Sequence, residues 1–265
     1  YQSGSYLKFE ANENYYKGEP SIKNVVFQII ENADTAILAL QNGEVDAYQM
    51  TPQQVKKLDL DASNLSTYSY SEGRVGYLEI NCNRVTDEKV RKALLYAMDR
   101  KAMDDAAFES SEYYSIPYTF LPTNSQFYTE DGVEKYEQDV DKAKSMLEDA
   151  GVSGLKLKLG YMSSDAVQSA QALLIQEQLK EVGAGGDGTA IANAMKDPDN
   201  EYDMYLGGYI MGIDPDTFSS LFENDGAYNY MHYSGYDTID QLFEEGRSEL
   251  DESARKETYA KLQAA

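Results

Sequence analysis

Three glycines in the second half of the chain have the spacing of a dinucleotide-binding loop. Gly183, Gly185 and Gly188 form a G-x-G-x-x-G pattern within EVGAGGDGTA. Such a loop cradles a pyrophosphate only where it follows a strand and opens a helix. The preceding residues, 164–183, instead have the pattern of a long amphipathic helix that stops at Gly183. This context argues against nucleotide binding.

The single cysteine, Cys82, and the single histidine, His232, are a second candidate for chemistry. One thiol allows neither an internal disulfide nor a thiolate metal site. The two residues are far apart in sequence, and neither lies in a catalytic motif. We therefore interpret Cys82 as a small buried side chain and His232 as an ordinary polar residue of the surface or core.

Carboxylates are abundant, but no pattern selects a catalytic or metal-binding set. Residues 197–203 (DPDNEYD) suggest a calcium loop, yet they lack the EF-hand glycine and closing glutamate, so a solvated turn is the better interpretation. G-x-S-x-G, H-E-x-x-H and P-loop motifs are absent. The sequence thus predicts no catalytic residue, no metal and no cofactor.

The composition is that of a globular protein with an excess of acid. Hydrophobic residues make up 42% and charged residues 26% of the 265 positions, which is ordinary. The net charge of −23 disfavours nucleic acid and anionic membranes as partners, because both are bound through lysine and arginine patches. No apolar run reaches the ~18 residues of a membrane span.

Strand and helix patterns alternate along the chain. A strand at 155–162, the helix at 164–183 and a strand at 203–210 predict an α/β layer in which helices pack on a sheet. The continuous apolar run at 25–30 predicts a buried strand, and Asp34 is the expected cap of the next helix. Further strands are expected at 5–11, 45–49, 64–70 and 76–81, and further helices at 35–42, 87–100, 139–151, 236–246 and 251–265.

Several segments, in order, carry a family resemblance. They are NENYYKGEPSIKNVVFQIIENADTAILALQNGEVDAY (12–48), GYLEINCNRVTDEKVRKALLYAMDRKAM (76–103), QEQLKEVG (176–183), EYDMYLGGYIMGIDPDTFSSLF (201–222) and the closing helices at 234–263. Together they resemble the extracellular solute-binding proteins of the peptide and nickel class, which deliver ligands to ABC importers.

The resemblance implies an α/β fold of the periplasmic-binding-protein-like type II, peptide-binder class. Residues 1–84 would be the remainder of lobe I, and residues 85–265 a lobe III-like α/β domain truncated at its C-terminus. Such proteins are extracellular or tethered to the membrane at the cell surface, and they trap a solute between lobes without catalysis. The implied partners are an oligopeptide or related small solute and an ABC permease, with a monomeric binding protein. This chain itself has no signal peptide, and Cys82 matches no lipidation site.

The resemblance also places ligand contacts near the D-P-D motif. Peptide-type members carry an aspartate a few residues earlier, where this chain has YIMG at 209–212, so a free-peptide ligand is open to question. The candidate ligand-binding residues are Tyr209, Met211, Asp214 and Asp216. Tyr209 and Met211 leave a strand and would line the cleft wall or the core. Asp214 would contact ligand or cap the next helix, and Asp216 is similarly a candidate first-turn acid.

Family members usually follow the helix ending at Gly183 with a short alternating strand. Here AGG stands in its place, so we expect that strand to be absent, either through residues missing before Asp187 or through a true loss. Asp187 or Thr189 would then cap a short helix reaching Met195.

Two other classes of function compete with transport. A carboxylate-based glycoside hydrolase would show two acids facing each other across a cleft, one of them with a raised pKa. A surface interaction module would show an exposed apolar patch rather than a cleft.

Overall fold

The computed structural model describes residues 1–58, 60, 64–190 and 202–265. Two compact units, Tyr1–Tyr68 and Ser69–Ala265, make up the chain, and each is described by itself. The sequence predicts a lobe boundary after residue 84, whereas the units divide after Tyr68. Residues 74–80 group with the second unit because they form a strand that pairs along its whole length with residues 204–210. The assignment of the units to lobes stays a prediction.

The first unit contains a two-stranded antiparallel sheet of β1 (Tyr6–Glu10) and β2 (Asn24–Gln28). The strand at 25–30 is confirmed, but its predicted burial is wrong, since every residue of β2 is exposed. Phe9 and Phe27 pack edge to face across the pair, with ring centroids 5.8 Å apart. Within the described part of this unit, the apolar side chains of the sheet therefore remain largely in contact with solvent.

Two short helices, α1 (Ala33–Gln41) and α2 (Pro52–Val55), complete the first unit. Asn32, rather than the expected Asp34, caps α1, because its side chain accepts the Thr35 N–H at 2.9 Å. Thr51 and Gln54 form a reciprocal capping box at the start of α2. The strands expected at 45–49 and 64–70 are wrong, since neither segment is paired.

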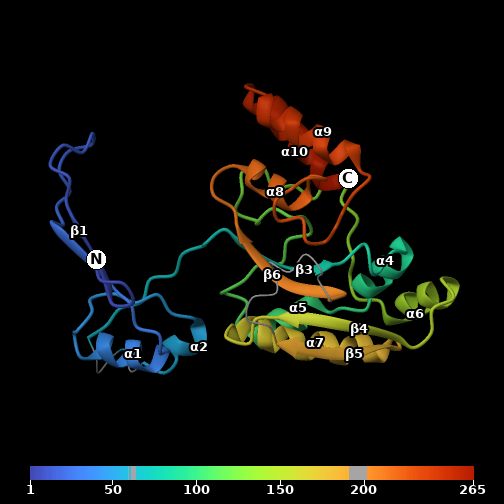
Figure 1. Ribbon diagram of the computed structural model, residues 1–265, viewed down its shortest axis with the longest axis horizontal. Helices are drawn as coiled ribbons and strands as arrows, with labels where there is room; N and C mark the ends of the chain where they lie inside the picture. Colours follow the sequence, from blue (N-terminus) through green and yellow to red (C-terminus); the bar gives the residue numbers. More distant parts are fainter. Residues whose placement is uncertain (59, 61–63, 191–201) are drawn as a thin grey trace. The chain divides into compact units, whose positions relative to one another are not determined.

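The second unit is built on a four-stranded sheet in the order β3-β6-β4-β5 (Figure 1). β3 is antiparallel to β6, and β4 is parallel to both β6 and β5. The strands span Arg74–Ile80 (β3), Leu155–Tyr161 (β4), Ala184–Ala190 (β5) and Met204–Ile210 (β6).

The expected loss of a strand after Gly183 is wrong. Ala184–Ala190 form β5, which pairs in parallel with the whole of β4. A side chain at Gly186 would be 1.7 Å from the carbonyl oxygen of Leu157, so the close approach of the two strands requires a glycine there. The helix expected from Asp187 or Thr189 is also wrong as far as residue 190, and its remainder lies outside the described residues.

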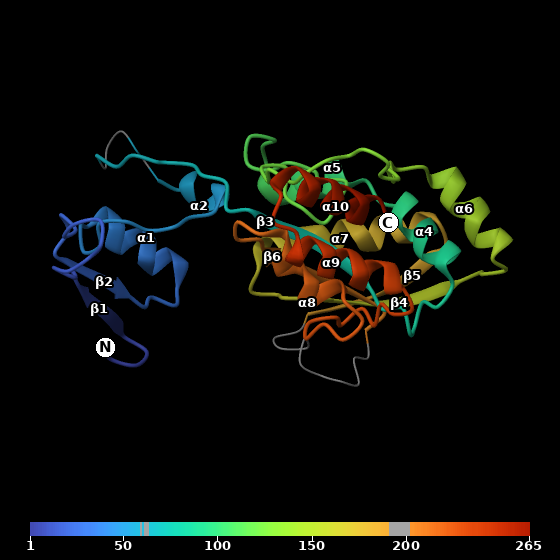
Figure 2. The same cartoon turned by 90° about the horizontal axis from the view of Figure 1, so that it is seen from above.

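Alternate residues of the strands serve two hydrophobic cores, one on each face of the sheet. In β3, Leu78 and Ile80 pack against the first core, whereas Val75 and Tyr77 belong with the second. The helices α5 and α7 lie on one side of the sheet and α9 and α10 on the other (Figures 1 and 2). Helices thus lie on both faces of this sheet, as in an α/β layer.

The helix predicted at 87–100 is interrupted. α4 ends at Tyr96, and Asp99 caps the following helix by accepting the Ala102 N–H at 2.9 Å. The apolar residues Val90, Ala93, Leu94, Ala97 and Met98 of this segment are nevertheless buried together in the first core. The helices that accompany the first core are α4 (Glu88–Tyr96), α5 (Arg100–Phe108), α6 (Val140–Asp149) and α7 (Ala166–Glu181).

The second core lies under the C-terminal helices and the aromatic loop at 115–128. Leu121 and Phe127 of that loop are buried. Gln263 fastens it, since its amide nitrogen donates to the carbonyl of Phe127 at 2.8 Å. The C-terminal elements are the 3₁₀ turn η2 (Pro215–Phe218), α8 (Ser219–Phe222), α9 (Asp237–Ser248) and α10 (Glu252–Ala264).

Aspartates begin many of the helical elements. Each of these side chains accepts a backbone N–H from the first turn, which satisfies a donor that the helix itself leaves free. The residues concerned are Asp87, Asp99, Asp139, Asp165, Asp214 and Asp251.

Candidate functional site

The candidate site lies where β3 begins and β6 ends. The Met211 N–H donates to the carbonyl of Gly73 at 3.1 Å, which extends the strand pairing by one residue. Beyond this bond an open pocket of about 330 Å³ lies between three chain segments. Its lining residues are Ser71, Glu72, Gly73, Asn124, Ser125, Gln126, Met211, Gly212 and Ile213.

The pocket has both polar and apolar walls, and one hydrogen bond joins two of them. Asn124 donates from its amide nitrogen to the hydroxyl of Ser71 at 2.8 Å. The sequence analysis missed residues 71–73 and 124–126 as lining residues. The available signal was the run TNSQ at 123–126, a polar stretch inside a loop that is otherwise aromatic.

Of the four predicted site residues, Met211 lines this pocket, although its side chain is also packed into the second core and only 6% exposed. Tyr209 is not a lining residue. Its ring packs on Phe218, with centroids 5.3 Å apart, and its hydroxyl lies 3.4 Å from that of Ser220. In this structure Tyr209 therefore contributes to packing, which was the alternative left open for it.

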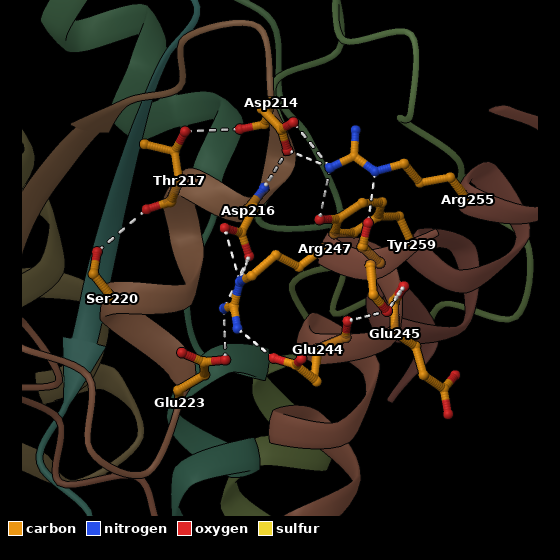
Figure 3. Close-up of polar contacts among 12 residues, drawn as sticks. Asp214, Asp216, Thr217, Ser220, Glu223, Glu244, Glu245, Arg247, Arg255 and Tyr259 are labelled. Carbon is orange, nitrogen blue, oxygen red and sulfur yellow. Dashed lines mark hydrogen bonds and ion pairs between the residues drawn. The ribbon is translucent and has the colours of Figure 1, made fainter. Parts of the chain in front are cut away.

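Asp214 caps η2 and forms an ion pair (Figure 3). Its Oδ1 accepts the Asp216 N–H at 3.0 Å and the Arg255 guanidinium at 2.7 Å. Partial burial acts to raise the pKa of Asp214, but the hydrogen bonds from Arg255 and Asp216 and the charge of Arg255 outweigh it and lower the pKa. The carboxylate is thus held in its charged form by groups of the chain itself.

Asp216 belongs to a neighbouring network centred on Arg247 (Figure 3). The guanidinium of Arg247 donates to Asp216 at 3.1 Å, to Glu223 at 2.9 Å and to Glu244 at 2.7 Å. The hydrogen bonds that Arg247 donates to Asp216 and Glu223 raise the pKa of its guanidinium. Both predicted acidic residues are therefore engaged by arginines of α9 and α10, which joins the turn after β6 to the C-terminal helices.

A buried carboxyl on β3 has no such partner. Glu79 is 4% exposed and has no hydrogen bond or ion pair within the part of the chain that the structure describes. It lies on the same face as Tyr77, and it is opposite Tyr205 in the strand register. Burial raises its pKa to about 7.

Two consecutive glycines of β6 make room for side chains of β3. A Cβ at Gly207 would be 2.3 Å from the ring of Tyr77, and one at Gly208 would be 2.4 Å from the guanidinium of Arg74. Tyr77 therefore lies over the main chain of β6 on one face, and Arg74 lies over it on the other.

The remaining chemical candidates are structural. Asp203, from the calcium candidate, is buried. It accepts Arg84 Nε at 2.6 Å and the Lys158 N–H at 2.7 Å, so the solvated turn expected there is wrong for this residue. Residues 197–201 lie outside the described residues. No group of three or more metal-binding side chains occurs among those that are described.

The thiol of Cys82 is also not activated. Its N–H donates to the carbonyl of Met231 at 2.8 Å, and burial raises the pKa of the thiol. A nucleophilic cysteine needs the opposite shift. Gly185 and Gly188 lie within β5 rather than in a loop that opens a helix, which removes the remaining argument for a pyrophosphate loop.

Several positions of the recognised motifs hold the fold together. The N–H of Asn81 donates to the carbonyl of Asp203 at 2.9 Å, and Arg91 donates to the carbonyls of Val85 and Thr86, both at 2.9 Å. Arg100 donates to the carbonyl of Pro117 at 3.0 Å. The motifs therefore identify a fold more directly than a ligand.

Comparison with known proteins agrees with this fold. Residues 1–230 match the model of bacterial extracellular solute-binding proteins, family 5, middle region. The chain belongs to this family of solute-binding proteins. The match gives no support to a glycoside hydrolase.

Two relatives of the chain are named as peptide-binding proteins. The oligopeptide-binding protein AppA of Bacillus subtilis is 26% identical over 99% of this chain and 52% of its own length. The dipeptide-binding protein of Escherichia coli is 26% identical over 99% of this chain and 51% of its length. The chain thus spans about half the length of these relatives.

Solved structures have the same fold. The ABC transporter substrate-binding protein CtaP of Listeria monocytogenes superposes with a TM-score of 0.88 at 35% identity, over 99% of this chain and 55% of that one. NikZ of Campylobacter jejuni, solved with Ni(L-His), gives a TM-score of 0.86 at 22% identity, over all of this chain and 57% of that one. The second unit and the first unit are thus parts of a type II periplasmic-binding-protein fold. Among the described residues, no helix is long and apolar enough to span a bilayer.

Proposed function

We propose that the chain is part of the solute-binding component of an ABC importer, which captures an oligopeptide or related small solute and delivers it to the membrane permease without catalysis. The observation that carries the proposal is the open pocket between the residues just before β3 and those just after β6, which offers both polar and apolar groups to a solute. Membership of family 5 supports the same conclusion.

The pocket has a feature that bears on the ligand. Peptide-type members of the family carry an aspartate just before D-P-D, and this chain has Gly212 in that region. Asp214 and Asp216 are held by Arg255 and Arg247. We therefore propose that recognition of a ligand ammonium by an aspartate of this loop is not the main source of affinity.

The first unit exposes apolar side chains on its sheet. Leu7, Phe9, Val26 and Phe27 are each more than 40% exposed on β1 and β2. Because the chain spans about half the length of its relatives, we propose that in the whole protein these side chains pack against other parts of the first lobe. We further propose a monomer, tethered at the cell surface, that binds no nucleic acid.

Thermal unfolding of the full-length gene product tests the proposal. A ligand that binds the folded state raises the apparent stability by mass action. Panels of peptides, nickel with histidine, amines and sugars would be compared, and we expect the largest rise in Tm with peptides. The absence of a rise with every panel would refute a solute-binding role. Turnover of a glycoside panel would instead establish the hydrolase alternative.

A further inference from the structure

Two side-chain amides line the pocket, those of Asn124 and Gln126. The amide of Asn124 is used within the chain, since its nitrogen donates to the hydroxyl of Ser71 at 2.8 Å. The side chain of Gln126 makes no hydrogen bond in the part of the chain that the structure describes. It therefore offers the pocket a carbonyl acceptor and two N–H donors.

The main chain that carries Gln126 is fixed on both sides. The Ser125 N–H donates to the carbonyl of Pro122 at 2.9 Å, and the carbonyl of Ser125 accepts the Tyr128 N–H at 3.1 Å. The next residue, Phe127, is 5% exposed and belongs to the second core. The point of attachment of the Gln126 side chain is thus ordered before any solute binds, which lowers the entropic cost of a contact.

The residues that line the pocket supply no positive charge. Glu72 is the one charged residue among them, and it has an interaction of its own. Asp214 and Asp216, in the turn just beyond the pocket, are each paired with an arginine of the C-terminal helices. Gln126 is thus a neutral lining side chain whose donors and acceptor are both free, and it suits an uncharged polar group.

The residues that follow β6 add an apolar surface to the pocket. Ile213 is a lining residue and is 88% exposed, and Met211 lines the same wall. An apolar group of a solute that covers Ile213 removes this surface from water, which is favourable. The pocket therefore matches a solute that combines neutral polar groups with apolar ones, as a peptide with aliphatic side chains does.

An amide side chain can bond both polar groups of a peptide residue. In an extended chain the N–H and the C=O of one residue point to the same edge, and Gln126 has an acceptor for the first and donors for the second. The side chains of asparagine and glutamine present the same two groups.

We propose that Gln126 is a specificity-determining residue that bonds the amide groups of the bound solute, supplied either by its main chain or by an asparagine or glutamine side chain. The proposal rests on the solute-binding function proposed above. It deepens that function, because it names neutral amide groups as the part of the solute that this pocket recognises.

The test uses the full-length gene product and three pools of pentapeptides randomised over uncharged residues. The first pool lacks asparagine and glutamine. The second has the same composition, but its peptide nitrogens are methylated, which removes the main-chain donors. The third is the methylated pool with asparagine and glutamine added. Apparent affinity would be read from the rise in Tm over a concentration series.

Gln126→Leu removes the amide and keeps a side chain of similar bulk. We expect it to weaken binding of the first pool by on the order of 10-fold, as for two neutral hydrogen bonds. Binding of the second pool should be weakened less, because methylation has already removed the donor that Gln126 would accept. Gln126→Glu keeps an acceptor, so it should distinguish the first two pools nearly as the wild type does. A weakening by Gln126→Leu that is seen only with the third pool would also support the proposal and would identify a ligand side chain as the source of the amide.

Gln241→Leu, at an exposed position of α9, is the matched control, and it should leave the affinity for every pool unchanged. Gln126 is itself exposed and unbonded, so Gln126→Leu should shift the Tm of the free protein by less than about 2 °C. A change in affinity without a change in the stability of the free protein separates recognition of the solute from a structural role.

The failures are distinguishable. If Gln126→Leu weakens binding of no pool, or of all three equally, the role of Gln126 is refuted and the solute-binding function stands. If neither these pools nor the wider panels of solutes raise the Tm of the wild type, the proposed function is refuted, and the proposal for Gln126 is refuted with it.

Discussion

One guanidinium nitrogen of Arg255 contacts both carboxylate oxygens of Asp214, at 2.7 and 2.9 Å. The same arginine donates from Nε to the carbonyl of Gly246 at 2.6 Å and lies over the ring of Phe127. It thereby joins the turn after β6 to α9, α10 and the aromatic loop. Asp214, a candidate for ligand contact or for capping, is in this fold part of a structural junction.

Substitutions of Asp214 separate these two roles. Asp214→Asn keeps a good helix cap and should cost less than about 1 kcal/mol of unfolding free energy, whereas Asp214→Ala loses cap and ion pair and should cost about 1–2 kcal/mol. Because the pKa of Asp214 is lowered, its contribution is present above the ordinary carboxyl pKa of 3.8 and is lost as the pH falls through the folded value.

Urea unfolding of both variants at pH 7 and pH 3 measures this prediction. The difference between wild type and Asp214→Asn should shrink at the lower pH. If Asp214→Asn instead abolished the rise in Tm with peptide pools while leaving stability unchanged, Asp214 would be a ligand contact.

Asp203 should be among the most sensitive acids of the second unit. Its replacement by alanine leaves the Lys158 N–H without its acceptor at 2.7 Å and Arg84 without its ion pair. We expect a loss of about 2–3 kcal/mol, since an orphaned buried donor costs about 1–3 kcal/mol by itself. Denaturant unfolding measures it, with Asp225→Ala, an exposed acid, as the control. Equal effects of the two substitutions would contradict the structural role of Asp203.

Glu79 should make the protein less stable as the pH rises. Its folded pKa of about 7 exceeds the ordinary value of 4.5, so between these values the unfolded chain releases a proton that the folded chain retains. Stability therefore falls from pH 4.5 to pH 7 and then stays lowered. The full shift corresponds to a penalty on the order of 3 kcal/mol above pH 7.

Glu79→Gln removes the titration and keeps the size of the side chain. We expect it to be more stable than the wild type at pH 8 and similar to it at pH 4.5, in chemical unfolding at both values. Glu257→Gln on the exposed side of α10 is the matched control and should show no such difference. A Glu79→Gln effect independent of pH would contradict a raised pKa.

The adjacent glycines of β6 should respond differently to alanine. Gly207→Ala places a methyl group 2.3 Å from the ring of Tyr77, which is packed against the second core, and should cost about 1–3 kcal/mol. Gly208→Ala meets only the end of the flexible Arg74 side chain and should change stability by less than about 1 kcal/mol. Thermal unfolding compares them directly. A larger loss for Gly208→Ala would show that the guanidinium is fixed more firmly than its contacts indicate.

Periodicity predicted the α/β layer because the strands at 155–162 and 203–210 and the helices around them bury regular faces. It failed for β5, where AGGDGTA has no apolar alternation and pairing depends on main-chain groups alone. The predicted cap of α1 was wrong because Asn32 and Asp34 could each cap this helix, and only the geometry of the folded chain selects Asn32.

The candidate site was predictable only in part. The D-P-D motif led to the turn beside the pocket and to Met211, a lining residue. The other walls come from residues 71–73 and 124–126, whose proximity depends on the packing of the aromatic loop under α10 rather than on any local pattern. For the same reason the sequence could not show that Asp214 and Asp216 are neutralised by arginines more than 30 residues away.

Part of the negative charge of the chain lies on the aspartates that begin its helices. Five of them, Asp87, Asp99, Asp139, Asp165 and Asp251, cap helices without an ion pair among the described residues. Asparagine accepts the same N–H groups and caps about equally well. Exchanging these five residues would bring the formal charge from −23 to −18, one unit for each, with every cap retained. At each of these five positions the helix therefore needs the oxygen atom of the side chain but not its negative charge, so the charge can be redesigned without loss of the cap.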